Sequence, residues 1–163
     1  LPSPTPVPTS TPTETPTPEP TLEPVTLYYR SNPDEILGTF PAYPFDGQAL
    51  YKNMIHLQEA LPVMQSALGG AHAGDAQACQ TYVEAYESIL NSGTFYEEVP
   101  GDWEEIHLRY ILSFIYALDR TRPAYLSCID SGGIGDFNHG LAWQAIDLTS
   151  ACSIRQSIGP GTG

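Results

Sequence analysis

The chain has 163 residues and a formal net charge of −13, with Lys52 as its single lysine. Binding to nucleic acid needs a basic surface, and attraction to an anionic membrane needs clustered Lys and Arg. We therefore expect no nucleic-acid partner. The sequence also contains no apolar run long enough to span a bilayer, so we expect no direct membrane insertion of this chain.

Residues 1–25 are a Pro/Thr-rich leader, as the run PSPTPVPTSTPTETPTPEPT illustrates. Proline fixes φ and lacks an N–H, and the segment has too little apolar surface to form a core, which predicts an extended polyproline II rod. The alternation of hydroxyl residues with prolines is typical of an O-glycosylated stalk, and an unmodified linker is the alternative. The candidate glycosylation sites are Thr5, Thr9, Ser10, Thr11, Thr13, Thr15, Thr17 and Thr21.

This leader resembles the spacers found in many secreted and surface-attached bacterial proteins. The resemblance covers only these residues of low complexity, and it implies an extracellular or cell-surface location. Because the sequence begins at Leu1 and not at Met, we also expect that a signal peptide has been removed.

Residues 26–45 form a lead-in that is rich in aromatic side chains. The segment SNPDEILG predicts one short helical turn, with Ser31 or Asn32 as the cap and Pro33 at the first helical position. The segment FPAYPF predicts an extended path, and VTLYY is the only candidate strand. The aromatic residues serve either as ligand contacts or as a lid over the core; they are Tyr28, Tyr29, Phe40, Tyr43 and Phe45.

Residues 46–158 are predicted to form a helical domain, followed by a flexible tail at 159–163. Apolar spacing indicates four amphipathic helices at about 46–68, 75–92, 102–122 and 136–157. Gly69 and Gly70 should end the first helix, Pro62 should kink it, and Pro123 should end the third. Short connections favour an all-α, up-down-up-down four-helix bundle.

The three cysteines, Cys79, Cys128 and Cys152, have no zinc-binding spacing. In a secreted protein they predict one disulfide and one buried thiol, and three reduced core cysteines are the alternative. In the bundle topology Cys79 lies near the end of the third helix, close to Cys128. A Cys79–Cys128 disulfide is therefore the preferred pairing.

Several acidic residues and histidines resemble the Glu-x-x-His pairs of ferritin-like metal proteins. The carboxylates have other interpretations. Asp102 and Glu105 fit a capping box, Asp136 fits an N-cap, and Glu104 complements the helix dipole in the first turn. The others, Glu59, Glu84 and Glu87, lie on polar helix faces. We therefore expect no metal and no cofactor. The residues considered are His56, Glu59, Glu84, Glu87, Glu104, Glu105, His107, Asp136 and His139.

His107 differs from this group because it lies on the apolar face of its helix, between Trp103 and Tyr110. It is either a hydrogen-bonded core residue or part of a metal-dependent site. Three functions follow from the sequence. The first is a non-enzymatic structural subunit of an extracellular filament or surface layer, which associates with itself or with another surface protein. The second is a stalk-tethered module that binds a protein or a glycan. The third is a secreted metal-dependent enzyme that uses His107.

Overall fold

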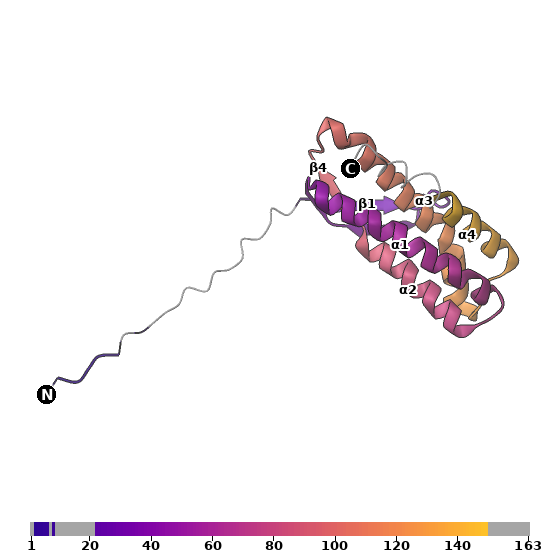
Figure 1. The fold of residues 1–163 in the computed structure, drawn as a ribbon, viewed down its shortest axis with the longest axis horizontal. Helices are drawn as coiled ribbons and strands as arrows, with labels where there is room; N and C mark the ends of the chain where they lie inside the picture. The colour runs from indigo at the N-terminus through magenta and orange to yellow at the C-terminus, as the bar shows by residue number, and fades with distance from the viewer. Residues whose placement is uncertain (1, 7, 9–21, 150–163) are drawn as a thin grey trace.

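A computed structural model of the chain describes residues 2–6, 8 and 22–149. Within them the four predicted helices are confirmed, and four short strands accompany the helices (Figure 1). The elements in chain order are β1 (Val25–Tyr28), β2 (Ile36–Phe40), β3 (Ala42–Pro44), α1 (Gly47–His72), α2 (Ala76–Ser92), β4 (Phe95–Glu97), α3 (Gly101–Ser131) and α4 (Asp136–Leu148).

The helices enclose one hydrophobic core. Each helix packs against the next in chain order, and α1 also packs against α4. The apolar seam predicted for α1 is confirmed, because all its members are at most 2 % exposed: Leu50, Met54, Leu57, Leu61, Met64 and Leu68. These side chains meet Tyr82 and Tyr86 from α2 and Phe114 from α3 in the same core.

Helix α1 is longer than predicted, because Gly69 and Gly70 do not end it. A Cβ on Gly70 would lie 2.7 Å from the Cβ of Ala78, so this glycine permits the close approach of α2. Ala71 is buried, and its carbonyl accepts hydrogen bonds from Gly74 and Ile134. Tertiary packing thus extends the helix through both glycines to His72, two residues beyond Gly70.

Helix α3 also runs past its predicted end, through Pro123 to Ser131. Proline removes one helical hydrogen bond, but the next turns bury Ala124 and Cys128, which offsets that loss. The helix ends where Gly132 adopts φ 70° and donates its N–H to the carbonyl of Cys128. The predicted Asp102 cap is wrong, because the N-cap is Pro100 and no side chain caps the helix.

The lead-in is a β-hairpin, so the predicted helical turn in SNPDEILG is wrong. Strand β1 begins at Val25, the last residue of the predicted leader, and pairs antiparallel with β2. The turn closes with hydrogen bonds from Tyr29 N to Glu35 O and from Glu35 N to Asn32 O. FPAYPF is extended as predicted, and its strand β3 pairs in parallel with β4.

A disulfide joins Cys79 of α2 to Cys128 of α3, as predicted. Disulfides persist in oxidising compartments, so this bond indicates folding in such an environment. Cys152 lies outside the described residues, as do the predicted end of the fourth helix and the tail.

Helix α4 begins at Asp136, and its N-cap is Gly135 rather than the expected Asp136. It can be followed to Leu148, with Thr149 at its C-cap. Over residues 22–149, none of the helices has the length and hydropathy needed to cross a membrane.

Candidate functional site

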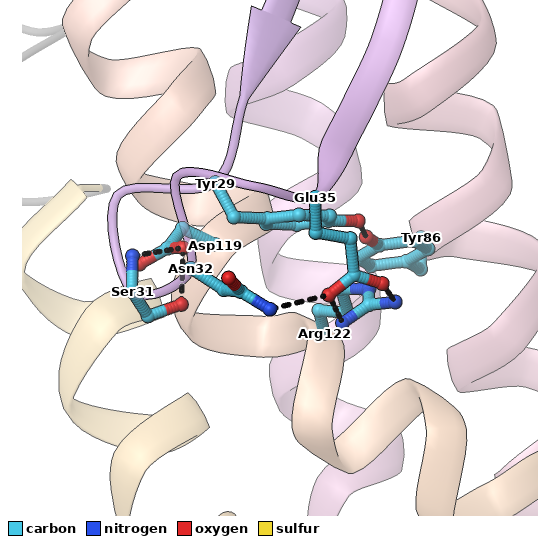
Figure 2. Close-up of polar contacts among 7 residues, drawn as sticks. All are labelled: Tyr29, Ser31, Asn32, Glu35, Tyr86, Asp119 and Arg122. Atoms are coloured by element: carbon cyan, nitrogen blue, oxygen red, sulfur yellow. Dashed lines mark hydrogen bonds and ion pairs between the residues drawn. The ribbon is translucent and has the colours of Figure 1, made fainter.

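The turn of the β1–β2 hairpin is fixed to α3 by a polar cluster that we call the hairpin anchor: Tyr29, Ser31, Glu35, Tyr86, Asp119 and Arg122 (Figure 2). Asp119 is 4 % exposed, and its Oδ1 accepts hydrogen bonds from Ser31 N at 3.1 Å and from Ser31 Oγ at 2.7 Å. Both nitrogens of the Arg122 fork donate to the carboxylate of Glu35. The two contacts hold opposite ends of the turn on the middle of α3.

Two tyrosines complete the hairpin anchor. The guanidinium of Arg122 lies 4.4 Å from the ring centroid of Tyr29, a cation–π distance. The hydroxyls of Tyr29 and Tyr86 are 3.2 Å apart. Burial raises the pKa of both tyrosines above the usual value, and the bond between their hydroxyls raises that of Tyr86 further. The polar side chains of the anchor thus satisfy one another, which suits a structural role.

The five predicted contact aromatics occupy different environments. Tyr29 and Phe40 lie in the core, where they are 5 % and 4 % exposed and offer no face to a ligand. Tyr28 is half exposed on the hairpin, next to Ile36 on the partner strand. Only Tyr43 and Phe45 line a common depression, so the structure does not bring the five residues together at one site.

That depression is the aromatic pocket, a cavity of about 560 Å³ that is open to solvent. It lies where strands β3 and β4 meet the start of α1, and this volume falls in the range of roughly 300–1,000 Å³ that small-molecule sites occupy. Its lining residues are Tyr43, Pro44, Phe45, Asp46, Ala49, Asn53, Thr94 and Tyr96.

Local sequence explains how these side chains reach one place. Tyr43 and Tyr96 are directly opposite each other in the parallel β3–β4 pair. Asp46 follows β3 and caps α1, because its Oδ1 accepts hydrogen bonds from the N–H groups of Gln48 and Ala49. Asn53 lies less than two turns further along α1, and its side-chain amide donates to the Tyr96 hydroxyl at 3.2 Å.

The walls of the pocket pack against other aromatic rings. The ring of Phe45 makes edge contacts with Tyr96 at 6.2 Å and a tilted contact with Trp103 at 5.4 Å between centroids. Burial raises the pKa of Tyr96 to about 12, and the nearby Asp46 carboxylate adds to this effect. The Tyr96 hydroxyl therefore keeps its proton at neutral pH.

His107 contacts Tyr96, one of the residues that line the pocket. Its Nε2 accepts a hydrogen bond from Tyr96 N at 3.4 Å, which requires this nitrogen to be unprotonated, and its ring lies 5.9 Å from that of Tyr96. Burial lowers the pKa of His107 below its ordinary value, in agreement with this role as acceptor. The interpretation as a hydrogen-bonded, partly buried histidine is therefore the one that its contacts support.

The other histidines have partners that sequence patterns did not indicate. His72, the last residue of α1, lies 2.6 Å from Asp136 through Nε2, and its ring stacks on His139 at 4.4 Å. His56 contacts the hydroxyl of Ser88 at 2.9 Å. In the part of the chain that the structure describes, no three His, Cys, Asp or Glu side chains converge in a geometry that would hold a metal ion.

Sequence reasoning missed Asp46, Asn53 and Tyr96 as members of a site. Asp46 was placed only at the start of a helix, and Tyr96 lies in a short strand that the helical pattern concealed. The available signal was the series of aromatic residues on both sides of the first two helices.

Comparison with protein-family models, with curated proteins and with solved structures found no match for this chain.

Proposed function

We propose that the protein is a non-enzymatic subunit of an extracellular or cell-surface assembly, in which the helical domain binds a partner through the aromatic pocket and the Pro/Thr-rich leader is an arm. The single observation that supports this is the pocket itself, open to solvent and built from Tyr43, Phe45 and Tyr96 on a packed frame. Rigid aromatic side chains give a large contact area and lose little conformational entropy on binding.

The groups in the pocket favour binding over catalysis. Asp46 already uses one carboxylate oxygen to cap α1, and the Tyr96 hydroxyl is held by Asn53. Burial keeps the Tyr96 hydroxyl protonated at neutral pH. What these side chains offer a ligand is ring faces and hydrogen bonds. A cofactor has no part in this proposal.

The proposal includes a location outside the cytosol and an up-down-up-down order of the four helices. The Cys79–Cys128 disulfide and the Pro/Thr-rich composition support a place outside the cytosol. Short connections between consecutive, contacting helices are what an up-down-up-down bundle needs. The arm would carry the bundle at a distance from its point of attachment, or link it to a neighbouring subunit.

A stalk-tethered module that binds carbohydrate is the second candidate. The observation that favours it is that the rings of Tyr43 and Phe45 line the same open cavity as the polar groups of Asp46 and Asn53. Ring faces pack against the C–H face of a sugar, and carboxylate and amide groups hydrogen-bond to its hydroxyls.

Negative-stain electron microscopy of the full chain, over a range of concentrations, tests the first candidate. Regular filaments, sheets or rings are expected. Single particles at every concentration would contradict it. In that case, binding of soluble polysaccharides to the wild-type chain, with loss in Tyr43→Ala, would support the carbohydrate module.

A further inference from the structure

The aromatic pocket has the properties of a site for an extended, uncharged chain. Tyr96 lines the pocket and is 6 % exposed; its hydroxyl accepts a hydrogen bond from Asn53, and among the described residues no acceptor takes its proton. Tyr43 lines the pocket and is 37 % exposed. The Asp46 carboxylate and the net charge of −13 disfavour an acidic ligand. A ligand with flat apolar faces and free backbone carbonyls fits these groups.

Residues 2–13 of the leader have this chemistry. They carry no charged side chain, and the first acidic residue is Glu14. A polyproline II helix has no internal hydrogen bonds, so its carbonyls are free to accept. Aromatic-lined grooves bind proline-rich segments because the extended form is already ordered before binding.

The spacing of the prolines makes such binding tolerant of register. Prolines stand at positions 2, 4, 6 and 8, and polyproline II has about three residues per turn. Each face of the rod therefore presents a proline ring within two turns. Several registers of the leader would therefore place a proline ring against Tyr43 or Phe45.

The position at which the leader leaves the domain indicates whether the segment in a pocket comes from the same copy of the chain or from another copy. Val25 pairs with Phe40, which precedes β3 by two residues, so the leader leaves the domain close to the pocket. If the leader adopts the polyproline II form that its composition predicts, then at about 3.1 Å per residue Thr13 lies roughly 37 Å along the rod from Val25. A semi-rigid rod would have to reverse its direction to bring residues 2–13 back to its own pocket.

We propose that the aromatic pocket binds residues 2–13 of the leader of a second copy of this chain. This inference rests on the proposed function and identifies the partner of its site. A contact between an arm and a pocket is heterologous, because each copy contributes a different surface. Such contacts give rings where the rotation closes and filaments where it does not.

Mixing two defective variants tests the inference. The full chain is produced without glycosylation as the pocket variant Tyr43→Ala, as an arm variant with Pro4, Pro6 and Pro8 each replaced by glycine, and as the control Tyr28→Ala, which removes an exposed aromatic outside the pocket. Light scattering coupled to size exclusion measures the mass of each sample and of the mixtures. Circular dichroism checks that each variant retains its helices.

The wild-type chain and the Tyr28→Ala control should form species whose mass rises with concentration. Each defective variant alone should associate about tenfold or more weakly, because loss of one aromatic anchor or of a pre-ordered ligand costs more than about 1.4 kcal/mol. Their equimolar mixture should form a 1:1 complex and grow no further, since only one intact arm and one intact pocket remain per pair.

Three results would overturn the inference, and they separate it from the proposed function. If the wild-type chain associates and the Tyr43→Ala and arm variants associate equally well, the assembly remains but this contact is wrong. If each variant is defective and the mixture forms no complex, the arm does not bind a second copy. If the wild-type chain remains monomeric throughout, the inference and the proposed function both fail.

Discussion

The hairpin anchor and the aromatic pocket are built from the same kinds of side chain, but they differ in what is left unpaired. In the anchor, Tyr29 is covered by Arg122, whose fork is filled by Glu35. In the pocket, Tyr43 and Phe45 line an open cavity beside the Asp46 carboxylate. In the hairpin anchor, aromatic and acidic residues are thus covered by their contacts with α3. In the aromatic pocket, the same kinds of residue line a cavity that is open to solvent.

The difference lies in the position of the positive charge. Arg122 lies on α3 under the hairpin turn, where it neutralises Glu35 and stacks on a tyrosine. The described residues that line the pocket include no Lys or Arg. Substitutions in the anchor should therefore lower the stability of the fold, and substitutions at the rim of the pocket should lower association.

Reduction of the Cys79–Cys128 disulfide should have the largest effect on stability. The bond joins α2 to α3 across 49 residues, and loss of a native disulfide of this kind costs about 2–4 kcal/mol. Thermal unfolding with and without reductant measures the change. Peptide mapping without reduction that found three free thiols would contradict the assigned bond.

Arg122→Ala should lower the free energy of unfolding by about 1–3 kcal/mol, because it removes two charge-assisted hydrogen bonds and a cation–π contact from a partly buried position. Arg120→Ala is the matched control, since the more exposed Arg120 side chain makes a single ion pair at 3.7 Å with Asp119 and a cation–π contact at 5.8 Å with Tyr116. Urea denaturation of both variants measures the difference. Equal losses in the two variants would show that the anchor does not hold the hairpin.

Tyr96→Phe should cost about 0.5–1.5 kcal/mol, because it removes one hydrogen bond and leaves the side-chain amide of Asn53 with one partner fewer. If the Tyr96 hydroxyl donates to the bound leader segment, as the proposed contact requires, Tyr96→Phe should also weaken association further than this loss of stability accounts for. Chemical denaturation and light scattering on the same preparation separate the two effects. Unchanged association would remove Tyr96 from the binding surface.

The smallest expected effect is the contribution of His107 to the pH dependence of the free energy of unfolding. Burial lowers its pKa below the ordinary value of 6.5. Between that lowered pKa and 6.5 the unfolded chain binds a proton that the folded chain does not, so stability falls as pH decreases through this window. His107→Gln should show a shallower decline than the wild-type chain over the same window. Parallel curves of unfolding free energy against pH would contradict the assignment.

The helices could be predicted because their apolar spacing is regular, and the Cys79–Cys128 pairing followed from their order. Local signals predicted both ends of α2, which has its N-cap at Asp75 and its C-cap at Gly93, but they did not predict the C-terminal ends of α1 and α3. Gly70 is a packing residue, not a stop, because it admits Ala78 of α2. Pro123 is tolerated because the turns beyond it bury Ala124 and hold the disulfide.

The site was less predictable than the helices because its parts come from separate segments. Tyr43 and Phe45 stood out as aromatics between prolines, but Tyr96 meets them only through the parallel pairing of β3 with β4. The SNPDEILG segment has good helix-start residues, yet contacts of Ser31 and Glu35 with α3 select a turn instead. Such long-range contacts leave no periodic signal in the sequence.

Photo-crosslinking from the pocket tests the central claim most directly. A photoreactive phenylalanine derivative replaces Tyr43 in a ¹⁵N-labelled chain, which is mixed with unlabelled chain, irradiated and mapped by mass spectrometry. The account predicts crosslinks from the labelled pocket to unlabelled peptides within residues 2–13. Crosslinks confined to the same chain, or to the helices of a second copy, would contradict it.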